Sequence, residues 1–225
     1  MQVTQLSYQF PKAKQALFTD LNFQLQSPGV NFLIGQNGVG KTTLVDIITG
    51  LRPATGTIDC PQDAIYLNQQ LPMLTSIRVC DVAKLVLGIE RGRLHFQLTE
   101  FESWVDAPTY RFLKPIWEQH YGQLSGGQRK LVQLLLFMQV DRQLVVLDEP
   151  TAAVDRQNVQ LLFEVMQAHP QRTYLMITHD VRDIQAFDDY RVLWLHDRQM
   201  TTLTKGEFER SDNQQWAFIT AFKAE

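Results

Sequence analysis

The sequence predicts an α/β fold with a mostly parallel sheet, and three observations indicate it. Short apolar runs bounded by turn residues, at residues 30–34 and 144–147, are typical of buried parallel strands. Segments with helical spacing alternate with such runs along much of the chain. The first run leads into a glycine-rich loop, and the second ends in Asp148 and Glu149. Because ligands bind at the carboxyl ends of strands in parallel sheets, we expect a ligand site there.

The N-terminal part is predicted to be an antiparallel β part. Residues 3–10 end in aromatic side chains, and residues 21–25 alternate apolar and polar side chains, as a half-buried strand does. The helix after the glycine-rich loop is expected to stop at Gly50. Residues 52–57 are predicted to form a loop, and residues 64–67 a short strand.

The stretch of residues 71–121 differs from the rest of the chain. No run in it resembles a buried parallel strand, and helical spacing recurs at residues 79–87, 98–105 and 110–120. We therefore predict one domain over residues 1–225, in which residues 71–121 form an inserted helical subdomain. The core of this domain is predicted to comprise residues 1–70 and 122–225.

Strands and helices alternate again after the insertion. Strands are predicted at residues 144–147, 174–177 and 191–195, the last being the final clear strand. Helices are predicted at residues 124–139, 159–168, 183–187 and 214–222.

The composition argues against several classes of protein. The 225 residues are 44% hydrophobic and 20% charged, as in soluble globular proteins, and the formal net charge of -3 gives no global attraction to nucleic acid. Cys60 and Cys80 form no C-x-x-C motif, so we expect structural thiols in a reducing compartment. The N-terminus has no signal-peptide pattern, and the longest apolar stretch, residues 131–140, is too short to span a bilayer. We expect that the chain does not cross a membrane itself.

The glycine-rich loop matches the phosphate-binding pattern G-x-x-x-x-G-K-[ST], between a predicted strand and a predicted helix. Its glycines let the backbone turn so that N–H groups point at an anion, and the helix N-terminus adds partial positive charge. Lys41 is expected to reach the β- and γ-phosphates, and the Thr42 hydroxyl to bind Mg²⁺. The alternative is a glycine-rich turn that happens to precede a lysine. The loop residues are Gly35, Gln36, Asn37, Gly38, Val39, Gly40, Lys41, Thr42 and Thr43.

Two carboxylates follow the strand at residues 144–147. Asp148 is expected at the carboxyl end of the sheet, where it can hold the Mg²⁺ that Thr42 also binds. Glu149 is the next residue and so projects differently, and we expect it to polarise a water for attack on the γ-phosphate. The alternative is that both carboxylates cap a turn before Pro150.

Residues 124–128, with the sequence L-S-G-G-Q, open a predicted helix. Ser125, Gly126, Gly127 and Gln128 are a second arrangement that can bind an anion at a helix N-terminus. By itself, an ordinary helix cap explains these residues equally well.

With these motifs in this order, the chain resembles the ATP-binding cassette (ABC) family, the nucleotide-binding subunit of ABC transporters. Residues 35–43 correspond to its Walker A motif, residues 124–128 to its LSGGQ signature and residues 144–149 to its Walker B motif. The resemblance covers nearly the whole chain. It implies the ABC ATPase fold, with a RecA-like P-loop NTPase core and an inserted helical subdomain.

The resemblance also implies roles for single residues. Gln69 matches the Q-loop glutamine that contacts Mg²⁺ and the attacking water, and His179 matches the switch histidine that contacts the γ-phosphate. Asp155 matches the aspartate of the D-loop. Ala152 and Val154 replace the commoner serine and leucine of that loop, which leaves the cross-interface contact of position 152 open.

The adenine contact and the size of the antiparallel part are left open by the resemblance. Phe10 falls where the family stacks an aromatic ring on adenine, Tyr8 is the rival, and either ring can instead belong to the core. Since the stretch between Lys41 and Gln69 is short, we expect a trimmed antiparallel subdomain. We expect no extra regulatory domain after the last strand.

The activity that the resemblance implies is hydrolysis of ATP, with Mg²⁺, to ADP and phosphate. The signature of one subunit would close over ATP held by another, so we expect a dimer with a second ABC subunit, most simply a copy of this chain. Transmembrane permease subunits would dock near residues 69–82, where Leu71, Met73, Leu74 and Ile77 are either contact residues or subdomain core.

The expected function is to power an ABC transporter, in a prokaryotic uptake system, from the cytoplasmic face of the cell membrane. The alternative is a non-transport cassette ATPase that acts on a soluble assembly or a nucleoprotein. We expect no direct contact with nucleic acid, because no long coiled coil and no second cassette is present in the sequence. Lys41, Asp148, Glu149 and His179 argue against an inactive regulatory cassette.

Overall fold

The computed structural model of the chain describes residues 1–61, 63–68, 75–210 and 217–224. The chain divides into two compact units. Unit 1 consists of Met1–Tyr66, Arg142–Glu149 and Gln171–Glu225, and unit 2 of Leu67–Asp141 and Pro150–Pro170. The helical subdomain predicted at residues 71–121 falls within unit 2, and its boundaries stay a prediction.

A six-stranded sheet has the strand order β5-β6-β7-β3-β8-β9. The neighbours β6–β7, β7–β3 and β3–β8 pair in parallel, and β8–β9 pair antiparallel. This confirms the predicted α/β fold with a mostly parallel sheet. The strands are β3 (Gly29–Ile34), β5 (Ile65–Leu67), β6 (Leu144–Asp148), β7 (Thr173–Ile177), β8 (Arg191–His196) and β9 (Gln199–Thr204).

The centre of this sheet is buried in the core of unit 1. Every residue of β7 is buried, as are the first four of β6 and the last four of β3. A strand that is covered on both faces needs apolar side chains in succession rather than in alternation, which explains why these runs were recognisable. Helix α1 (Lys41–Ile48) adds Leu44, Val45, Ile47 and Ile48 to the same core.

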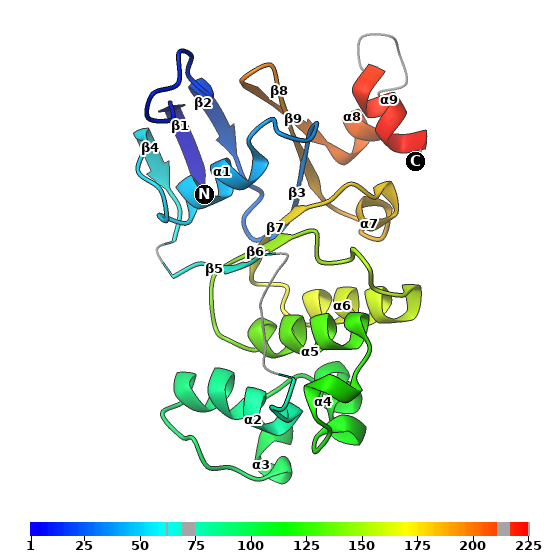
Figure 1. Cartoon of the computed structure of the whole chain (residues 1–225). Helices are drawn as coiled ribbons and strands as arrows, with labels where there is room; N and C mark the ends of the chain where they lie inside the picture. The colour runs from blue at the N-terminus through cyan, green and yellow to red at the C-terminus, as the bar shows by residue number, and fades with distance from the viewer. Residues whose placement is uncertain (62, 69–74, 211–216, 225) are drawn as a thin grey trace. The chain divides into compact units, whose positions relative to one another are not determined.

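A second sheet holds β1 (Gln2–Tyr8), β2 (Phe18–Gln24) and β4 (Thr55–Asp59) in the order β2-β1-β4, and these strands lie side by side in Figure 1. Both pairings are antiparallel, which confirms the predicted N-terminal antiparallel part. The prediction of a loop at residues 52–57 is wrong from Thr55 onward, because β4 begins there. Four of the five residues of β4 are exposed, so the strand has no apolar alternation that would have marked it.

The prediction that residues 191–195 form the last strand is wrong, because β9 follows β8 in a hairpin. His196 pairs with Gln199, and the two residues between them, Asp197 and Arg198, have positive φ angles of 46° and 64°. This is the backbone of a tight hairpin turn, but it lacks the usual Asn-Gly or Asp-Gly signal. Helices α7 (Val181–Gln185), α8 (Lys205–Arg210) and α9 (Ala217–Ala224) complete the described part of unit 1.

The regular secondary structure of unit 2 is mainly helical in its described residues. Its predicted helix at residues 79–87 is α-helical only to Ala83 and continues as a π-helical turn. Its predicted helix at residues 110–120 is shorter, because the α-helix ends at Leu113, two residues before Pro115. The helices are α2 (Val79–Ala83), η1 (Lys84–Gly88), α3 (Leu98–Glu102), α4 (Ala107–Leu113), η2 (Lys114–Ile116), η3 (Tyr121–Gln123), α5 (Gly126–Met138) and α6 (Arg156–Ala168).

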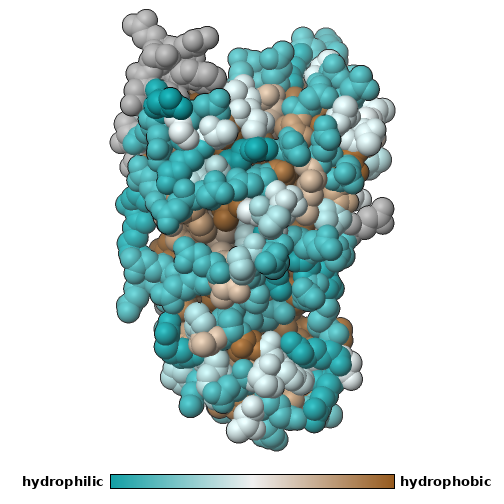
Figure 2. All heavy atoms as spheres, turned by 180° about the vertical axis from the view of Figure 1, so that it is seen from behind, coloured by the Kyte–Doolittle hydropathy of each residue, from teal (hydrophilic) through white to brown (hydrophobic). Residues whose placement is uncertain are grey.

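The face of the molecule shown in Figure 2 is mainly hydrophilic. On the face shown in Figure 2, hydrophobic areas are broken up by hydrophilic side chains. Among the helices of the described ranges, none combines the length and the apolar character that crossing a bilayer requires.

Candidate functional site

The glycine-rich loop joins β3 to α1 in a conformation that requires glycine at two places. Gly40, the residue before α1, has a φ of 108°, and a Cβ there would lie 2.9 Å from the buried ring of Phe18. Gly35 has a φ of 153°, and its Cβ would lie 2.4 Å from the carbonyl oxygen of Leu195. The loop is therefore packed against the sheet, with its backbone rather than side chains available to an anion.

Lys41 is the first residue of α1, and its side chain turns back into the loop. Its ammonium donates to the carbonyl oxygens of Gly35 at 2.7 Å and Gln36 at 3.2 Å, and the residue is only 8% exposed. Burial lowers the pKa of Lys41, and the charges of Glu149 and Asp148 oppose this shift. The two carboxylates thus act electrostatically on the cation of the loop.

The backbone turns sharply where β6 ends. Asp148 is the last residue of the strand, and Glu149 adopts a left-handed conformation with a φ of 48°. That conformation costs a residue other than glycine about 1–2 kcal/mol. The Glu149 amide donates to the carbonyl oxygen of Ile177 at 3.0 Å, which fixes the turn to the end of β7.

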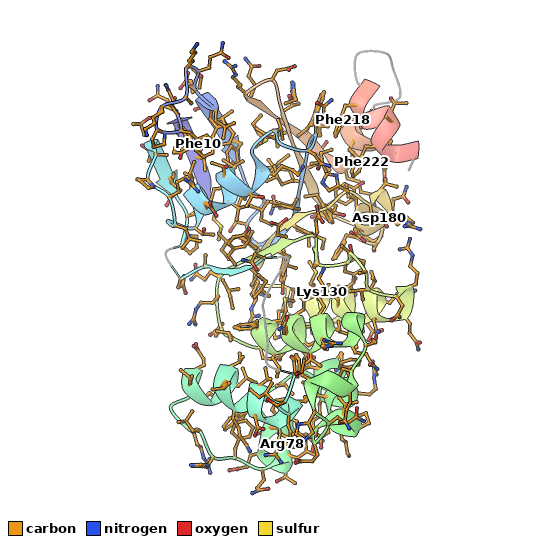
Figure 3. The ribbon with its side chains drawn as sticks, in the orientation of Figure 1. Phe10, Arg78, Lys130, Asp180, Phe218 and Phe222 are labelled. Carbon is orange, nitrogen blue, oxygen red and sulfur yellow. The ribbon has the colours of Figure 1, made fainter. Side chains whose placement is uncertain are left out.

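His179 follows β7 and meets Glu149, with 3.5 Å between Nε2 and Oε1. The residues on both sides of the histidine are anchored. The Thr178 hydroxyl donates to the buried Asp183 at 2.6 Å and accepts from the Asp180 amide at 3.0 Å. Asp180 caps α7 by accepting from the Arg182 amide, and Figure 3 shows it at the start of that helix. Unit 1 therefore holds the imidazole next to the Glu149 carboxylate.

Tyr66 is a residue of the site that the sequence did not reveal. It lies on β5, and its hydroxyl donates to Oδ2 of Asp148 at 3.1 Å. Burial raises the pKa of Tyr66, and the charge of Asp148 raises it further, so the phenol remains a donor at neutral pH. Gln69, predicted shortly after this strand, lies outside the described residues.

Phe10 and Tyr8 differ in how much ring they offer to a ligand. Phe10 is 39% exposed and follows β1, next to the antiparallel sheet (Figure 3). Tyr8 is half-buried, and its hydroxyl accepts from Arg52 at 3.1 Å. The rings meet edge to face with centroids 5.1 Å apart. Phe10 is thus the more accessible ring, and Tyr8 supports it.

The residues of the L-S-G-G-Q stretch form a closed helix cap in unit 2. The Ser125 side chain accepts from the Gln128 amide at 3.1 Å, and the Gln128 side chain accepts from the Ser125 amide at 2.9 Å. Ser125 and Gly126 are exposed at the start of α5. Gly127 packs against the next loop, since a Cβ there would lie 3.1 Å from the carbonyl oxygen of Ala153.

The loop that follows Glu149 is attached to α5 and α6 within unit 2. Lys130, labelled in Figure 3, donates to the carbonyl oxygen of Ala152 at 3.0 Å. Asp155 caps α6 by accepting from the Asn158 amide at 3.0 Å. Of the predicted site residues, Phe10, the loop at 35–43, Asp148, Glu149 and His179 lie in unit 1, whereas Ser125–Gln128 and Asp155 lie in unit 2.

The donors present fit a nucleotide phosphate and a hard divalent cation. A glycine cradle with a buried ammonium suits a phosphate, and the Thr42 hydroxyl and Asp148 carboxylate are oxygen ligands of the kind Mg²⁺ prefers. In the described part of the chain, His, Cys, Asp and Glu form no group of three that could hold a metal by itself.

Comparison with known proteins agrees with this geometry. Residues 18–152 match the family model described as "ABC transporter". A molybdate import ATP-binding protein of Haemophilus influenzae is 28% identical over 192 residues, covering 81% of this chain and 74% of that protein. An aliphatic sulfonates import ATP-binding protein of Rhodococcus jostii is 31% identical over 200 residues, covering 87% and 79%.

Solved structures share the fold. An ATP-binding subunit of an ABC transporter superposes with a TM-score of 0.75 at 18% identity, covering 100% of this chain and 99% of that one. The predicted fold, with its parallel core, antiparallel part and helices, is confirmed.

Proposed function

The chain belongs to the ABC transporter family and is an ATPase of that family, and we propose that it powers an ABC transporter by ATP-driven dimerisation, in an uptake system. The observation that carries this proposal is the group formed by the phosphate loop, Lys41, Asp148, Glu149 and His179 within unit 1. Two relatives are named as import proteins, for molybdate and for aliphatic sulfonates, and this supports uptake as the direction of transport.

Nucleotide binding is proposed to begin at the phosphate loop. The loop amides and the α1 N-terminus would bind the phosphates, and Lys41 would exchange its bonds to Gly35 and Gln36 for bonds to phosphate oxygens. Mg²⁺, when bound, would neutralise charge that develops on the phosphates, with Thr42 and Asp148 as its protein ligands. Tyr66 would orient Asp148 through its hydrogen bond.

Hydrolysis is assigned to Glu149 and His179. Glu149 would accept a proton from the water that attacks the γ-phosphate. His179, 3.5 Å from that carboxylate, would orient it and donate to a γ-phosphate oxygen. Gln69 is proposed to contact the same water and the metal. The contacts of the two carboxylates support this division of roles, because Asp148 meets Tyr66 whereas Glu149 meets His179.

Dimerisation is proposed because exposed anion-binding groups lie outside the unit that carries the phosphate loop. Ser125, Gly126, Gly127 and Gln128 would close over ATP held by a second copy of the chain, with Asp155 nearby. ATP would then join two surfaces that separate after hydrolysis, because the contact to the γ-phosphate is lost. A permease would dock near residues 69–82, of which residues 75–82 are described, at the cytoplasmic face of the membrane.

Two experiments test this function. The purified chain should release phosphate from ATP only when Mg²⁺ is present, and absence of any Mg-ATP binding or hydrolysis would refute the ATPase. A tagged chain should also recover a polytopic membrane protein from detergent-solubilised native membranes. Reproducible recovery of only ribosomes, nucleic acid or soluble assemblies would instead support the non-transport alternative.

A further inference from the structure

Arg52 connects helix α1 to the two aromatic residues near the end of β1. Its Nη2 and Nε donate to Oδ2 of Asp46 at 3.1 and 3.4 Å, and its Nη1 donates to the Tyr8 hydroxyl at 3.1 Å. Asp46 lies on α1, the helix that begins at the phosphate loop. A planar guanidinium that is held by two partners has little freedom to turn, so the position of Arg52 is well defined.

The same guanidinium also covers both rings. Its carbon lies 5.6 Å from the centroid of Phe10 and 5.7 Å from that of Tyr8. Both distances lie within the range of cation–π attraction. The exposed Phe10 ring thus has two neighbours, the Arg52 guanidinium and the Tyr8 ring, and these fix its orientation.

A cavity shows why that orientation needs support. It has a volume of about 720 Å³ and is lined by Gln9 and Pro11, the two chain neighbours of Phe10, as well as by Tyr8, Arg52 and Pro53. A space of this size accepts a phenyl ring. Without the guanidinium, we expect Phe10 to turn into it and lose its defined outward position.

We propose that Arg52 is a positioning residue that keeps the Phe10 ring ready to stack on the base of the bound nucleotide. This inference rests on the proposed function, in which Phe10 is the ring that contacts the base. Arg52 would act on the base through Phe10 and would leave phosphate binding unchanged. Since a ring that is already ordered loses less entropy on binding, the effect should appear in affinity for nucleotide.

The test compares two probes, Mg-ATP and inorganic tripolyphosphate with Mg²⁺, which has the phosphates but no base. Calorimetry should show that Arg52→Ala binds Mg-ATP about twofold to fivefold more weakly, with tripolyphosphate affinity unchanged. Tyr8→Phe removes only the hydroxyl acceptor and should have a smaller effect of the same kind. In steady-state hydrolysis Arg52→Ala should raise KM and leave kcat unchanged.

A double-mutant cycle with Phe10→Ala tests whether Arg52 affects nucleotide affinity through Phe10. If Arg52 acts through Phe10, Arg52→Ala should weaken Mg-ATP binding in the wild-type background but not in the Phe10→Ala background. Arg111→Ala is the matched control, because Arg111 also pairs with a carboxylate, Glu164 at 3.0 Å, but lies in unit 2. Thermal unfolding of each variant should be cooperative, which shows that every variant is folded.

Two results would overturn the inference. One is an equal loss of ATP and tripolyphosphate affinity in Arg52→Ala, and the other is an unchanged affinity for both. If instead the wild-type chain binds neither probe, the proposed function itself fails. The two failures are therefore distinguishable.

Discussion

Glu149 occupies a backbone conformation that a glutamate seldom adopts, at the point where β6 leaves the sheet. Strain of this kind persists where the surrounding structure enforces it, here through the hydrogen bond that the Glu149 amide donates to the carbonyl oxygen of Ile177 at the end of β7. Asp148 and Glu149 were predicted as site residues because two carboxylates follow the strand in the sequence. The left-handed turn at Glu149 and its contact with His179 were not predicted. Positive φ at a glutamate has no local sequence signal, unlike positive φ at glycine, asparagine or aspartate.

Replacing Glu149 by glutamine tests its role as proton acceptor. The amide keeps the size of the side chain but accepts a proton poorly, so we expect Mg-ATP binding close to wild type and hydrolysis lowered by about 10²-fold or more. Calorimetry and phosphate release measure the two effects. Glu164→Gln, which alters an exposed carboxylate of unit 2, should retain wild-type turnover. Wild-type hydrolysis by the Glu149→Gln variant would remove Glu149 from the mechanism.

Replacing Lys41 by alanine should act at the binding step. The variant loses the only loop side chain with a full positive charge and should bind Mg-ATP about tenfold more weakly or worse. Calorimetric titration gives the affinity, and Lys84→Ala, in unit 2, is the matched control. Unchanged affinity in Lys41→Ala would contradict the assignment of the phosphate loop.

At the scale of elements, a polar cluster joins the ends of three helices in unit 2. Asp106 caps α4 by accepting from the Thr109 amide at 2.8 Å, and its Oδ2 accepts from Gln139 at 2.6 Å at the end of α5. His169, which follows α6, lies 3.2 Å from the same oxygen. One carboxylate thus joins the ends of three helices, and sequence patterns revealed none of this, since the partners lie 33 and 63 residues away.

The Asp106 cluster predicts a dependence of stability on pH. Burial acts to raise the pKa of Asp106, but hydrogen bonds from His169, Thr109 and Gln139 outweigh it, and the pKa is lowered. In the unfolded chain an aspartate has a pKa of about 3.9, so in acid the unfolded chain binds more protons at this position than the folded chain does. The stabilisation from Asp106 is therefore present above about pH 4 and is lost as the pH falls further.

The variant Asp106→Asn measures this contribution. At pH 7 its free energy of unfolding should be about 1–3 kcal/mol lower than that of the wild type, and the difference should shrink below about pH 4. Urea titrations at pH 7 and in acid give both values. Equal stability of the two proteins at pH 7 would show that the cluster contributes nothing.

Helices and strands could be predicted where their own residues form a recognisable pattern. The sequence predicted β3, β6 and β7 because a strand buried on both faces requires a continuous apolar run. It predicted the loop before α1 because phosphate binding requires a characteristic run of residues. Strands β4 and β9 were missed because their partners, β1 and β8, stabilise them by pairing, and pairing leaves little trace in a polar strand.

At the scale of the whole molecule, the motifs of the site are divided between two compact units. The sequence predicted the motifs because each is a short local structure. It could not predict the contact between Tyr66 and Asp148 or the contact between Arg52 and Tyr8. The residues of these pairs are 82 and 44 positions apart, and no sequence pattern links them. Completing the site with Ser125–Gln128 of a second copy is the central claim of the proposed function.

Sedimentation velocity of Glu149→Gln tests that claim most directly, because this variant should hold ATP without consuming it. With saturating Mg-ATP we expect the chain to sediment as a dimer, and with ADP, or with ATP in the absence of Mg²⁺, as a monomer. Adding Ser125→Arg, which places a bulky side chain at the exposed cap, should abolish the dimer and leave nucleotide binding intact. A monomer that calorimetry shows to be saturated with Mg-ATP would contradict ATP-driven dimerisation.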